Sequence, residues 1–302
     1  MVKYNQQPTK IISVNNNDIC CFQSGVNHEN IDQKTVESFG EEWKKFANFN
    51  NQEIESIGDE YFDIVNSSHL DENSIVLDLG CGSGRWTKYL SNKVKFIEAV
   101  DPSNAVLSTT QFLNENKNVR VSKASVDNIP FQNKSFDFAF SLGVLHHIPN
   151  TEEALKKVVE KVKLNGWVLI YLYYKLDNRG VLYRLIFKIS CIPRFFISKM
   201  PNKIKHLLCE IIAFTVYVPL VTFSSIIKAI FKNEFYNKIP LSYYVGKSLN
   251  VIRNDALDRF GTPLEQRFSK KEIKQMMINS GLGEIIFSSK QPYWHAVGKR
   301  IK

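Results

Sequence analysis

The segment from Val76 to Arg85 reads V-L-D-L-G-C-G-S-G-R, an apolar run that breaks into glycines at Gly80, Gly82 and Gly84. An apolar run without polar alternation is typical of a parallel strand that is covered on both faces. Glycines between a buried strand and a helix let backbone N–H groups approach a ligand that a Cβ atom would hold away. The segment therefore predicts a strand, a ligand-binding loop and a helix, in that order.

Short apolar runs alternate with helix-compatible stretches on both sides of this loop. The pattern predicts strands over 74–79, 95–100, 119–125, 136–141 and 167–173, and helices over 85–91, 104–114 and 151–162. Such strict alternation predicts an α/β fold with a doubly wound, mostly parallel sheet. In the last of these helices the apolar residues share one face: Ala154, Leu155, Val158, Val159 and Val162.

The pattern resumes near the end of the chain after an interruption. Ser269 and Glu272 form a capping box, which predicts a helix that runs to about residue 280 and ends at Gly281. Residues 284–289 and 293–297 then predict an antiparallel hairpin that completes a seven-stranded sheet. The predicted organisation is an N-terminal extension with a cap helix (1–60), a core (61–179), a helical insertion (180–250) and a C-terminal completion of the sheet (251–302).

An aromatic stripe precedes the first strand of the core. Phe39, Trp43 and Phe46 recur at helical spacing in F-G-E-E-W-K-K-F. Packing against the sheet is the favoured interpretation. The alternative is that this helix roofs the ligand site, with Trp43 or Phe39 facing the ligand.

The spacing of the glycines separates two classes of ligand. A dinucleotide loop has the pattern G-x-G-x-x-G, in which the third glycine lets the helix pack on the strand. Counted from Gly80, that third position holds Arg85. A pyrophosphate site, and with it a nicotinamide-dependent oxidoreductase, is therefore disfavoured.

The glycine loop and the residues after it resemble a known family. D-L-G-C-G-S-G from Asp78 to Gly84 resembles motif I of the class I S-adenosylmethionine-dependent methyltransferases. V-D-N-I-P-F, S-F-D and L-G-V-L-H-H-I, between Val126 and Ile148, are similar to the type 11 or ubiquinone-biosynthesis-like branch, which methylates small molecules. The resemblance implies a Rossmann-like methyltransferase fold and S-adenosyl-L-methionine as the cofactor.

The resemblance also implies a set of cofactor-binding residues. Asp101 in I-E-A-V-D-P-S matches the family's acidic residue, which accepts hydrogen bonds from the ribose hydroxyls. Relatives commonly carry an aspartate where Ser125 stands, so the adenine contact falls to the Ser125 hydroxyl, the backbone at Val126 or Asp127. The full set is Asp78, Gly80, Cys81, Gly82, Gly84, Asp101, Pro102, Ser125, Val126, Asp127, Ser141 and Leu142.

Methyl transfer is an in-line displacement that depends mainly on positioning, and an oxygen or nitrogen acceptor adds the need for a base. No metal is required. The candidate catalytic residues follow the fourth and fifth strands, where open α/β sheets bind ligands: His146, His147 and Tyr173. The alternatives to a catalytic role are a histidine that bonds to backbone at the start of a helix and a tyrosine that anchors the next segment.

The N-D-A-L-D-R cluster begins at Asn254. Surface ion pairing is the favoured interpretation of this cluster, and substrate contact is the alternative.

The positive charge is concentrated in the insertion. The chain has a net charge of +9, and residues 181–240 carry nine Lys or Arg against two Glu, which is +7. Residues 211–227 are seventeen consecutive positions without a charge, with Pro219 near the centre. A membrane-spanning helix needs about 20 apolar residues, so a soluble helical lid and peripheral membrane contact through 181–240 are the two favoured interpretations. The basic residues are interleaved with aliphatic ones, which disfavours a nucleic-acid partner.

The five cysteines are odd in number and lack zinc-ligand spacing, which predicts reduced thiols and no metal site. Met1 to Gln7 lead into polar sequence without a secretion signal. We expect a cytoplasmic protein, or one peripheral at the inner face of a membrane.

The predicted function is S-adenosylmethionine-dependent methylation of a small-molecule, lipid-linked or glycan-type acceptor. The alternatives are a non-catalytic S-adenosylmethionine-binding regulatory protein and an RNA methyltransferase.

Overall fold

The computed structural model describes residues 1–15, 17–22, 30–46, 50–231 and 234–302. The chain divides into two compact units. The core unit comprises residues 1–175 and 264–302, and the helical unit comprises residues 176–263. The helical unit thus extends beyond the predicted insertion (180–250) at both ends.

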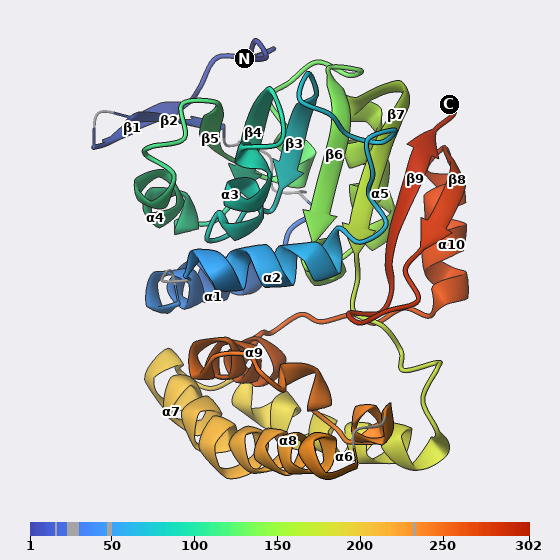
Figure 1. Ribbon diagram of the computed structural model, residues 1–302. Helices are drawn as coiled ribbons and strands as arrows, with labels where there is room; N and C mark the ends of the chain where they lie inside the picture. The colour runs from blue at the N-terminus through green and yellow to red at the C-terminus, as the bar shows by residue number, and fades with distance from the viewer. Residues whose placement is uncertain (16, 23–29, 47–49, 232–233) are drawn as a thin grey trace. The chain divides into compact units, whose positions relative to one another are not determined.

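The core unit is built on one sheet, which has nine strands among the described residues. The strand order is β1-β2-β5-β4-β3-β6-β7-β9-β8. The strands from β2 to β7 in this order are parallel, whereas β1, β9 and β8 are antiparallel to their neighbours (Figure 1). The strands are β1 (Lys10–Val14), β2 (Asn17–Phe22), β3 (Ile75–Leu79), β4 (Phe96–Asp101), β5 (Val119–Ala124), β6 (Phe136–Leu142), β7 (Val162–Tyr171), β8 (Leu282–Phe287) and β9 (His295–Arg300).

The predicted fold class is confirmed, with one correction to the strand number. β3 to β9 are the seven predicted strands, and β8 and β9 form the predicted antiparallel hairpin. β1 and β2 add a second hairpin at the opposite edge, so the described sheet has nine strands rather than seven. β2 pairs in parallel with β5, from Cys20 opposite Ser122 to Phe22 opposite Ala124. That pairing joins segments far apart in sequence, and the short N-terminal strands carry no alternation strong enough to reveal it.

Helices cover the sheet and the edge at which its parallel strands end. In Figure 1, α1 and α2 run across the edge to which the arrowheads of β3 and β6 point. Side chains cap both helices: Asp32 accepts from the Thr35 N–H (2.8 Å), and Asn50 accepts from the Glu53 N–H (2.7 Å). The helices of the core unit are α1 (Gln33–Lys45), α2 (Asn51–Tyr61), α3 (Arg85–Ser91), α4 (Ala105–Phe112), α5 (Thr151–Lys161) and α10 (Lys270–Asn279), with short 3₁₀ turns η1 (Val126–Asn128) and η2 (Leu145–His147).

The hydrophobic core lies between the sheet and the helices α5 and α10. The predicted apolar face of α5 is buried, because Leu155 and Val158 have no exposed surface. Ile273 and Met277 of α10 join the same cluster and are also fully buried. The capping box of α10 is present as predicted, since Ser269 accepts from the Glu272 N–H and Glu272 accepts from the Ser269 N–H.

The described part of the helical unit contains helices and connecting turns, and no strand. Its α7, a π-helical turn and α8 follow without interruption, so residues Asn202–Phe231 form one helix of 30 residues. By length and composition this helix is apolar enough to cross a membrane. The elements are α6 (Val181–Ile197), α7 (Asn202–Ile212), the π-helical η3 (Ala213–Tyr217), α8 (Val218–Phe231), η4 (Glu234–Lys238), η5 (Ser242–Tyr244) and α9 (Leu249–Gly261).

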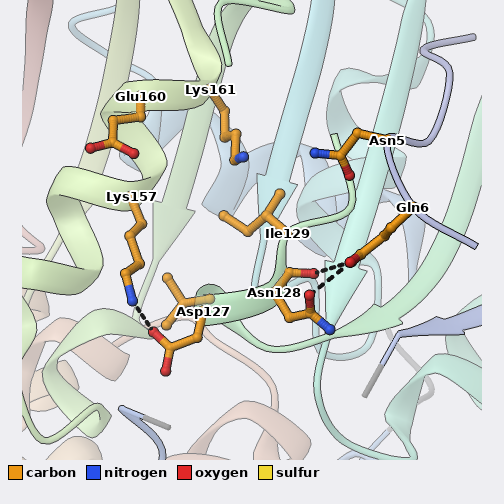
Figure 2. Close-up of a pocket in the computed structure, with 9 residues that line it drawn as sticks. Asn5, Gln6, Asp127, Asn128, Ile129, Lys157, Glu160 and Lys161 are labelled. Carbon is orange, nitrogen blue, oxygen red and sulfur yellow. Dashed lines mark hydrogen bonds and ion pairs between the residues drawn. The ribbon is translucent and has the colours of Figure 1, made fainter. Parts of the chain in front are cut away.

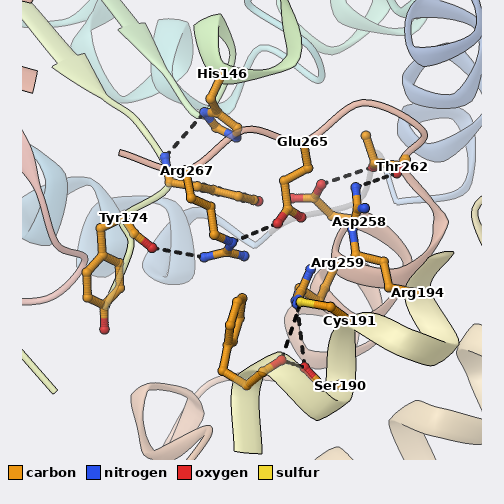
Figure 3. A network of polar contacts seen from close by, with 12 residues as sticks. His146, Tyr174, Ser190, Cys191, Arg194, Asp258, Arg259, Thr262, Glu265 and Arg267 are labelled. Carbon is orange, nitrogen blue, oxygen red and sulfur yellow. Dashed lines mark hydrogen bonds and ion pairs between the residues drawn. The ribbon is translucent and has the colours of Figure 1, made fainter. Parts of the chain in front are cut away.

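Polar contacts inside the helical unit centre on α9. Arg253 makes a two-pronged ion pair with Glu210 of α7, with both N···O distances at 2.7 Å. Asp255 accepts hydrogen bonds from Tyr244 and Tyr217, and burial raises the pKa of its carboxyl to about 6. Arg259 is buried and its guanidinium lies 3.3 Å from the Cys191 sulfur (Figure 3). Asp255 and Arg259 of the N-D-A-L-D-R cluster therefore make contacts inside this unit, to Tyr217, Tyr244 and Cys191.

Candidate functional site

The glycine loop after β3 requires glycine at its three positions. Gly80, Gly82 and Gly84 have φ values of +81°, +50° and +82°, in the left-handed region that disfavours side chains. A Cβ atom on Gly82 would lie 2.8 Å from Nε1 of Trp43, and one on Gly80 would lie 2.4 Å from a methyl group of Val144. Neighbouring side chains therefore pack closely against the loop, and a side chain at any of the three glycine positions would meet them.

Asp101 stands beside this loop at the end of β4. Its Oδ2 accepts a hydrogen bond from the Gly82 N–H at 3.0 Å, and its Oδ1 accepts from the Ser103 N–H (2.8 Å) and hydroxyl (2.6 Å). The residue is 8% exposed. A carboxylate oxygen accepts about two hydrogen bonds, so among the described contacts Oδ2 keeps acceptor capacity. Pro102, the next residue, is half-buried.

Asp78 and Cys81 are buried on the inner side of the loop. The Thr87 hydroxyl donates to Oδ2 of Asp78 at 2.5 Å. Burial raises the pKa of the Asp78 carboxyl to about 8; the Thr87 hydrogen bond opposes this shift and the nearby Asp101 charge adds to it. Burial, with the same two carboxylates, raises the pKa of the Cys81 thiol well above its usual value. Asp78 therefore orders the loop mainly as a neutral acid, and Cys81 is an unreactive thiol.

Ser125, Val126 and Asp127 form the start of the turn η1 after β5. The Ser125 hydroxyl is buried and has no hydrogen-bond partner among the described residues. Asp127 is engaged instead, because it pairs with Lys157 of α5 at 2.5 Å and accepts from the backbone N–H of Asn30. Of the two side chains predicted for the adenine contact, the structure thus leaves the Ser125 hydroxyl available and commits Asp127 to an ion pair.

A polar pocket of about 270 Å³ lies on the Asp127 side of this turn (Figure 2). Figure 2 shows Asp127 turned toward Lys157, and Gln6 reaching Asn128, whose Oδ1 accepts from Gln6 Nε2 at 2.8 Å. The lining of the pocket includes residues of the N-terminus, η1 and α5, and none of the three loop glycines. The pocket therefore borders the predicted cofactor-binding set at Val126 and Asp127, but not at the glycine loop.

Ser141 and Leu142 end β6 next to the loop. The Ser141 hydroxyl donates to the Leu79 carbonyl oxygen at 2.9 Å, and the residue has no exposed surface. This bond fixes the end of β3 against β6, so the Ser141 side chain supports the loop from behind. Leu142 is buried, and the chain then turns at Gly143, where φ is +78°.

His146, His147 and Tyr173 form one aromatic cluster at the ends of β6 and β7. The His146 ring stacks on the Tyr173 ring at 3.9 Å between centroids and lies 4.0 Å from the His147 ring. Phe39 of α1 meets His147 edge-on at 4.8 Å. The structure thus brings the three predicted catalytic residues together. The aromatic stripe has two roles: Phe46 is 1% exposed and packs in the core, whereas Trp43 lies against Gly82 and Phe39 lies against His147.

The two histidines have different tautomers because their Nδ1 partners differ. Nδ1 of His147 lies 2.6 Å from the Leu264 carbonyl oxygen, so this nitrogen carries the proton and Nε2 holds a lone pair. Nδ1 of His146 accepts from the Tyr173 N–H at 3.4 Å, so its proton is on Nε2. Burial, and then the charges of His147 and Arg267, lower the pKa of His146 well below its usual value. Both Nε2 atoms are buried; in these tautomers the Nε2 of His146 carries a proton and the Nε2 of His147 carries a lone pair.

Arg267 and Glu265 complete the cluster and were not predicted from the sequence. Arg267 Nε donates to Glu265 at 2.7 Å, its Nη1 donates to the Tyr174 carbonyl oxygen at 3.3 Å, and its guanidinium lies 5.0 Å from the Tyr173 ring centroid (Figure 3). Burial lowers the pKa of Arg267, but Glu265 outweighs it and the net shift is upward. E-Q-R in a loop has no periodicity or motif that marks it, so no sequence signal could have found this pair.

Both ring nitrogens of His295 make structural contacts. Nδ1 of His295 faces the Pro292 carbonyl oxygen and Nε2 faces Oδ1 of Asp63, both at 2.7 Å. Both ring nitrogens are therefore engaged by structural partners. Among the residues that the structure describes, no group of three or more His, Cys, Asp or Glu side chains is arranged to hold a metal ion.

Comparison with known proteins gives a family match over this region. A family model described as a methyltransferase domain matches residues 77–170. A tRNA (carboxymethyluridine(34)-5-O)-methyltransferase of Saccharomyces cerevisiae is 35% identical over 102 residues, which are 32% of this chain and 35% of the relative. A tRNA U34 carboxymethyltransferase of Nautilia profundicola is 29% identical over 133 residues, covering 43% of this chain and 40% of the relative. The chain thus spans less than half the length of either curated relative.

The crystal structure of a SAM-dependent methyltransferase from Thermotoga maritima superposes with a TM-score of 0.47 at 13% identity, covering 89% of this chain and 100% of that chain. The matched family segment, 77–170, begins just before the glycine loop and ends in β7. It contains Asp101 and both histidines of the aromatic cluster. Residues 77–170 therefore match a methyltransferase domain, in agreement with the resemblance of this region to the class I S-adenosylmethionine-dependent methyltransferases.

Proposed function

We propose that this protein binds S-adenosylmethionine at the β3–α3 loop and transfers its methyl group to a small-molecule or lipid-linked acceptor. The observation that carries the proposal is the bond between the Gly82 N–H and Asp101, beside a glycine loop that has no room for side chains. Such a loop with a carboxylate at its edge suits a nucleoside with two adjacent hydroxyl donors.

The residues of the site fit this cofactor. Gly80, Gly82 and Gly84 adopt left-handed backbone conformations that glycine favours, as expected of a loop whose backbone follows a ligand closely. Asp101 keeps acceptor capacity for the ribose hydroxyls, and the buried Ser125 hydroxyl lacks a partner among the described groups, as expected of a contact that the adenine completes. Backbone groups at Val126 provide a second contact for the adenine edge.

The remaining residues of the predicted set support the site from behind. Asp78, held by Thr87 and mostly neutral at pH 7, orders the loop without adding a second negative charge beside Asp101. Ser141 ties β6 to the end of β3. Cys81, Pro102 and Leu142 supply buried or half-buried surface around the cofactor. Asp127 acts through its ion pair with Lys157, which fixes the η1 turn.

When bound, S-adenosylmethionine supplies a methyl group on a positively charged sulfur. The protein's part is to orient the acceptor, exclude water and remove a proton where the acceptor is an oxygen or nitrogen. His147 is the proposed base, because Leu264 holds the proton on Nδ1 and leaves a lone pair on Nε2. His146 is a positioning residue that stacks on Tyr173, and Tyr173 lines the acceptor side.

A tRNA acceptor is the second candidate. It is favoured by the two curated relatives above, which are named as tRNA-modifying enzymes. Both matches cover the methyltransferase domain and less than half of each relative, so they support the domain more strongly than the acceptor. The small-molecule or lipid-linked class remains first because the helical unit presents apolar side chains instead of a basic groove with stacking aromatics.

Two measurements test the proposal in sequence. Isothermal titration with S-adenosylmethionine and S-adenosylhomocysteine tests the cofactor, and absence of binding by either at high micromolar concentration would contradict it. Methyl-labelled cofactor is then supplied with a lipid extract, a sugar-containing small-molecule extract or total tRNA. Label in the organic phase supports a lipid-linked acceptor, whereas label precipitated with tRNA and released by ribonuclease supports the second candidate.

A further inference from the structure

α6 faces solvent with its apolar side chains. Leu182 is 70% exposed, Ile189 57% and Phe196 58%. Six of the exposed apolar residues share one face, because their spacing follows the helical repeat: Leu182, Leu185, Ile186, Ile189, Ile192 and Phe196. The opposite face carries the contacts to α9, where the Arg259 guanidinium lies 4.4 Å from the Phe187 ring centroid. A surface helix of a water-soluble protein has the reverse arrangement.

The long helix Asn202–Phe231 repeats this inversion. Only 28% of its most apolar window is buried. The inward positions include polar side chains, with Lys205, Tyr217 and Ser224 at most 4% exposed. Many of the outward positions are large and apolar, and they include Ile204, Leu207, Ile211, Phe214, Phe223, Ile226 and Ile230. Exposed apolar surface on this scale is a site of interaction in soluble proteins.

The charge of the segment identifies the chemistry of the partner. Residues 181–240 carry a net charge of +7. Arg184, Lys188 and Lys199 are exposed and lie on α6 or just after it, so cationic groups border the apolar face. A face with both properties matches an anionic bilayer, whose head groups attract the cations and whose acyl boundary accepts the apolar side chains.

The contacts between α9 and the long helix Asn202–Phe231 indicate that this helix lies on the bilayer surface and does not cross the bilayer. Arg253 holds Glu210 by two hydrogen bonds, and Asp255 bonds Tyr217. Those two contacts join one face of the long helix to charged groups of α9. A helix that crossed the bilayer would bring these charged groups into the hydrocarbon, which is energetically costly. The uncharged run 211–227 has seventeen residues, short of the roughly 20 that a span requires.

We propose that the helical unit docks on the surface of an anionic lipid bilayer. The outward faces of α6 and of helix Asn202–Phe231 enter the boundary between head groups and acyl chains, and Arg184, Lys188 and Lys199 contact lipid phosphates. This inference goes beyond methyl transfer and does not depend on it.

Sedimentation of the full-length protein with vesicles tests the proposal. One set of vesicles contains phosphatidylcholine alone, and the other contains phosphatidylcholine mixed with phosphatidylglycerol. We expect cosedimentation with the phosphatidylglycerol vesicles, weaker binding to phosphatidylcholine, and a decrease in high salt because screening reduces the attraction of the exposed cations.

Three variants separate the apolar contribution from the charged one. L185E/I189E places charges on the outward face of α6 and should weaken vesicle binding at least about tenfold. R184E/K188E leaves that face intact and should weaken binding to anionic vesicles by about fivefold or more for each reversed charge, with little change on neutral ones. L164E is the matched control, because Leu164 is 51% exposed on β7 in the core unit, and it should bind like the original protein. All four positions of the test variants are exposed, so the unfolding midpoints should stay close to that of the parent.

Several results would overturn the proposal. Recovery of the full chain in the supernatant with both kinds of vesicle would do so, as would sedimentation of L185E/I189E to the same extent as the parent. Dimerisation that L185E/I189E abolishes, without vesicle binding, would show that a second copy covers this face. Resistance to extraction by alkaline carbonate would show a helix that crosses the bilayer. Titration with S-adenosylmethionine on the same samples separates each of these from failure of the proposed enzymatic function.

Discussion

The backbone N–H of Gly82 donates to Oδ2 of Asp101 at 3.0 Å, which joins the loop after β3 to the last residue of β4. The two strands are parallel neighbours, with Leu79 opposite Val100. The carboxylate is fixed at both oxygens, because Ser103 donates twice to Oδ1. A ligand that enters the loop therefore meets an acceptor that is already oriented, which lowers the entropic cost of binding.

D101A should weaken binding of S-adenosylmethionine by about 1.5–3 kcal/mol, or roughly tenfold to a hundredfold, because it removes charge-assisted hydrogen bonds. Isothermal titration measures the change. S103A is the control, since it removes one donor to Asp101 and keeps the carboxylate, and it should cost much less. Equal affinity of D101A and the parent would place the ribose elsewhere.

G82A should destabilise the folded protein by at least about 1–2 kcal/mol, because alanine disfavours the left-handed conformation at φ +50°. Its Cβ also meets Trp43 Nε1 at 2.8 Å, which adds to the cost. G180A is the matched control: nothing lies within 4 Å of a Cβ there and φ is −64°. Chemical denaturation compares the two, and similar free energies of unfolding would contradict the proposed crowding of the loop.

The free energy of unfolding of D78N, relative to that of the parent, should increase with pH. Asp78 has a pKa near 3.8 in the unfolded chain and about 8 in the folded one. Between these values the unfolded chain releases a proton that the folded protein keeps, so the parent loses up to about 1.4 kcal/mol of stability per pH unit as the pH rises. The asparagine variant lacks this loss. Its free energy of unfolding relative to the parent should rise from pH 4 to 8 and then level off; a constant difference would mean that Asp78 titrates normally.

H147A should lower kcat about 10²- to 10⁴-fold for an oxygen or nitrogen acceptor, while the Kd for S-adenosylmethionine stays the same. The reason is that His147 presents Nε2 as a base, held by the Nδ1 contact to Leu264. Y173F is the control, because it removes the hydroxyl and keeps the ring that stacks on His146. The reverse order of the two effects would make Tyr173 the base.

E265Q should destabilise the protein by about 1.5–3 kcal/mol, because it weakens a charged hydrogen bond to a guanidinium that is largely removed from water. E284Q is the matched control. Glu284 pairs with Lys299 at a similar distance, 3.0 Å, but its side chain is 60% exposed, and such surface pairs contribute about 0–1 kcal/mol. Equal losses in the two variants would show that the burial of the Arg267 pair adds nothing.

Local patterns were sufficient for most of the core unit. The helix over 85–91, the capping box at Ser269 and the closing hairpin are present as predicted. Each depends on residues close together in sequence, where hydrophobic spacing, caps and glycines act directly. The N-terminal hairpin was missed because its place in the sheet depends on β5, far along the chain.

The sequence by itself determined the glycine loop, the carboxylate at the end of the next strand and the alternation that makes the sheet parallel. Strand period and backbone sterics act within a few residues, so they can be read directly. Only the tertiary structure decided which nitrogen of each histidine carries the proton, that Asp127 is held by Lys157, and that Arg267 lies against Tyr173. These depend on partners from other elements. It also decided that α6 and the long helix face outward with their apolar sides, because amphipathic spacing gives a face but not the direction in which that face points.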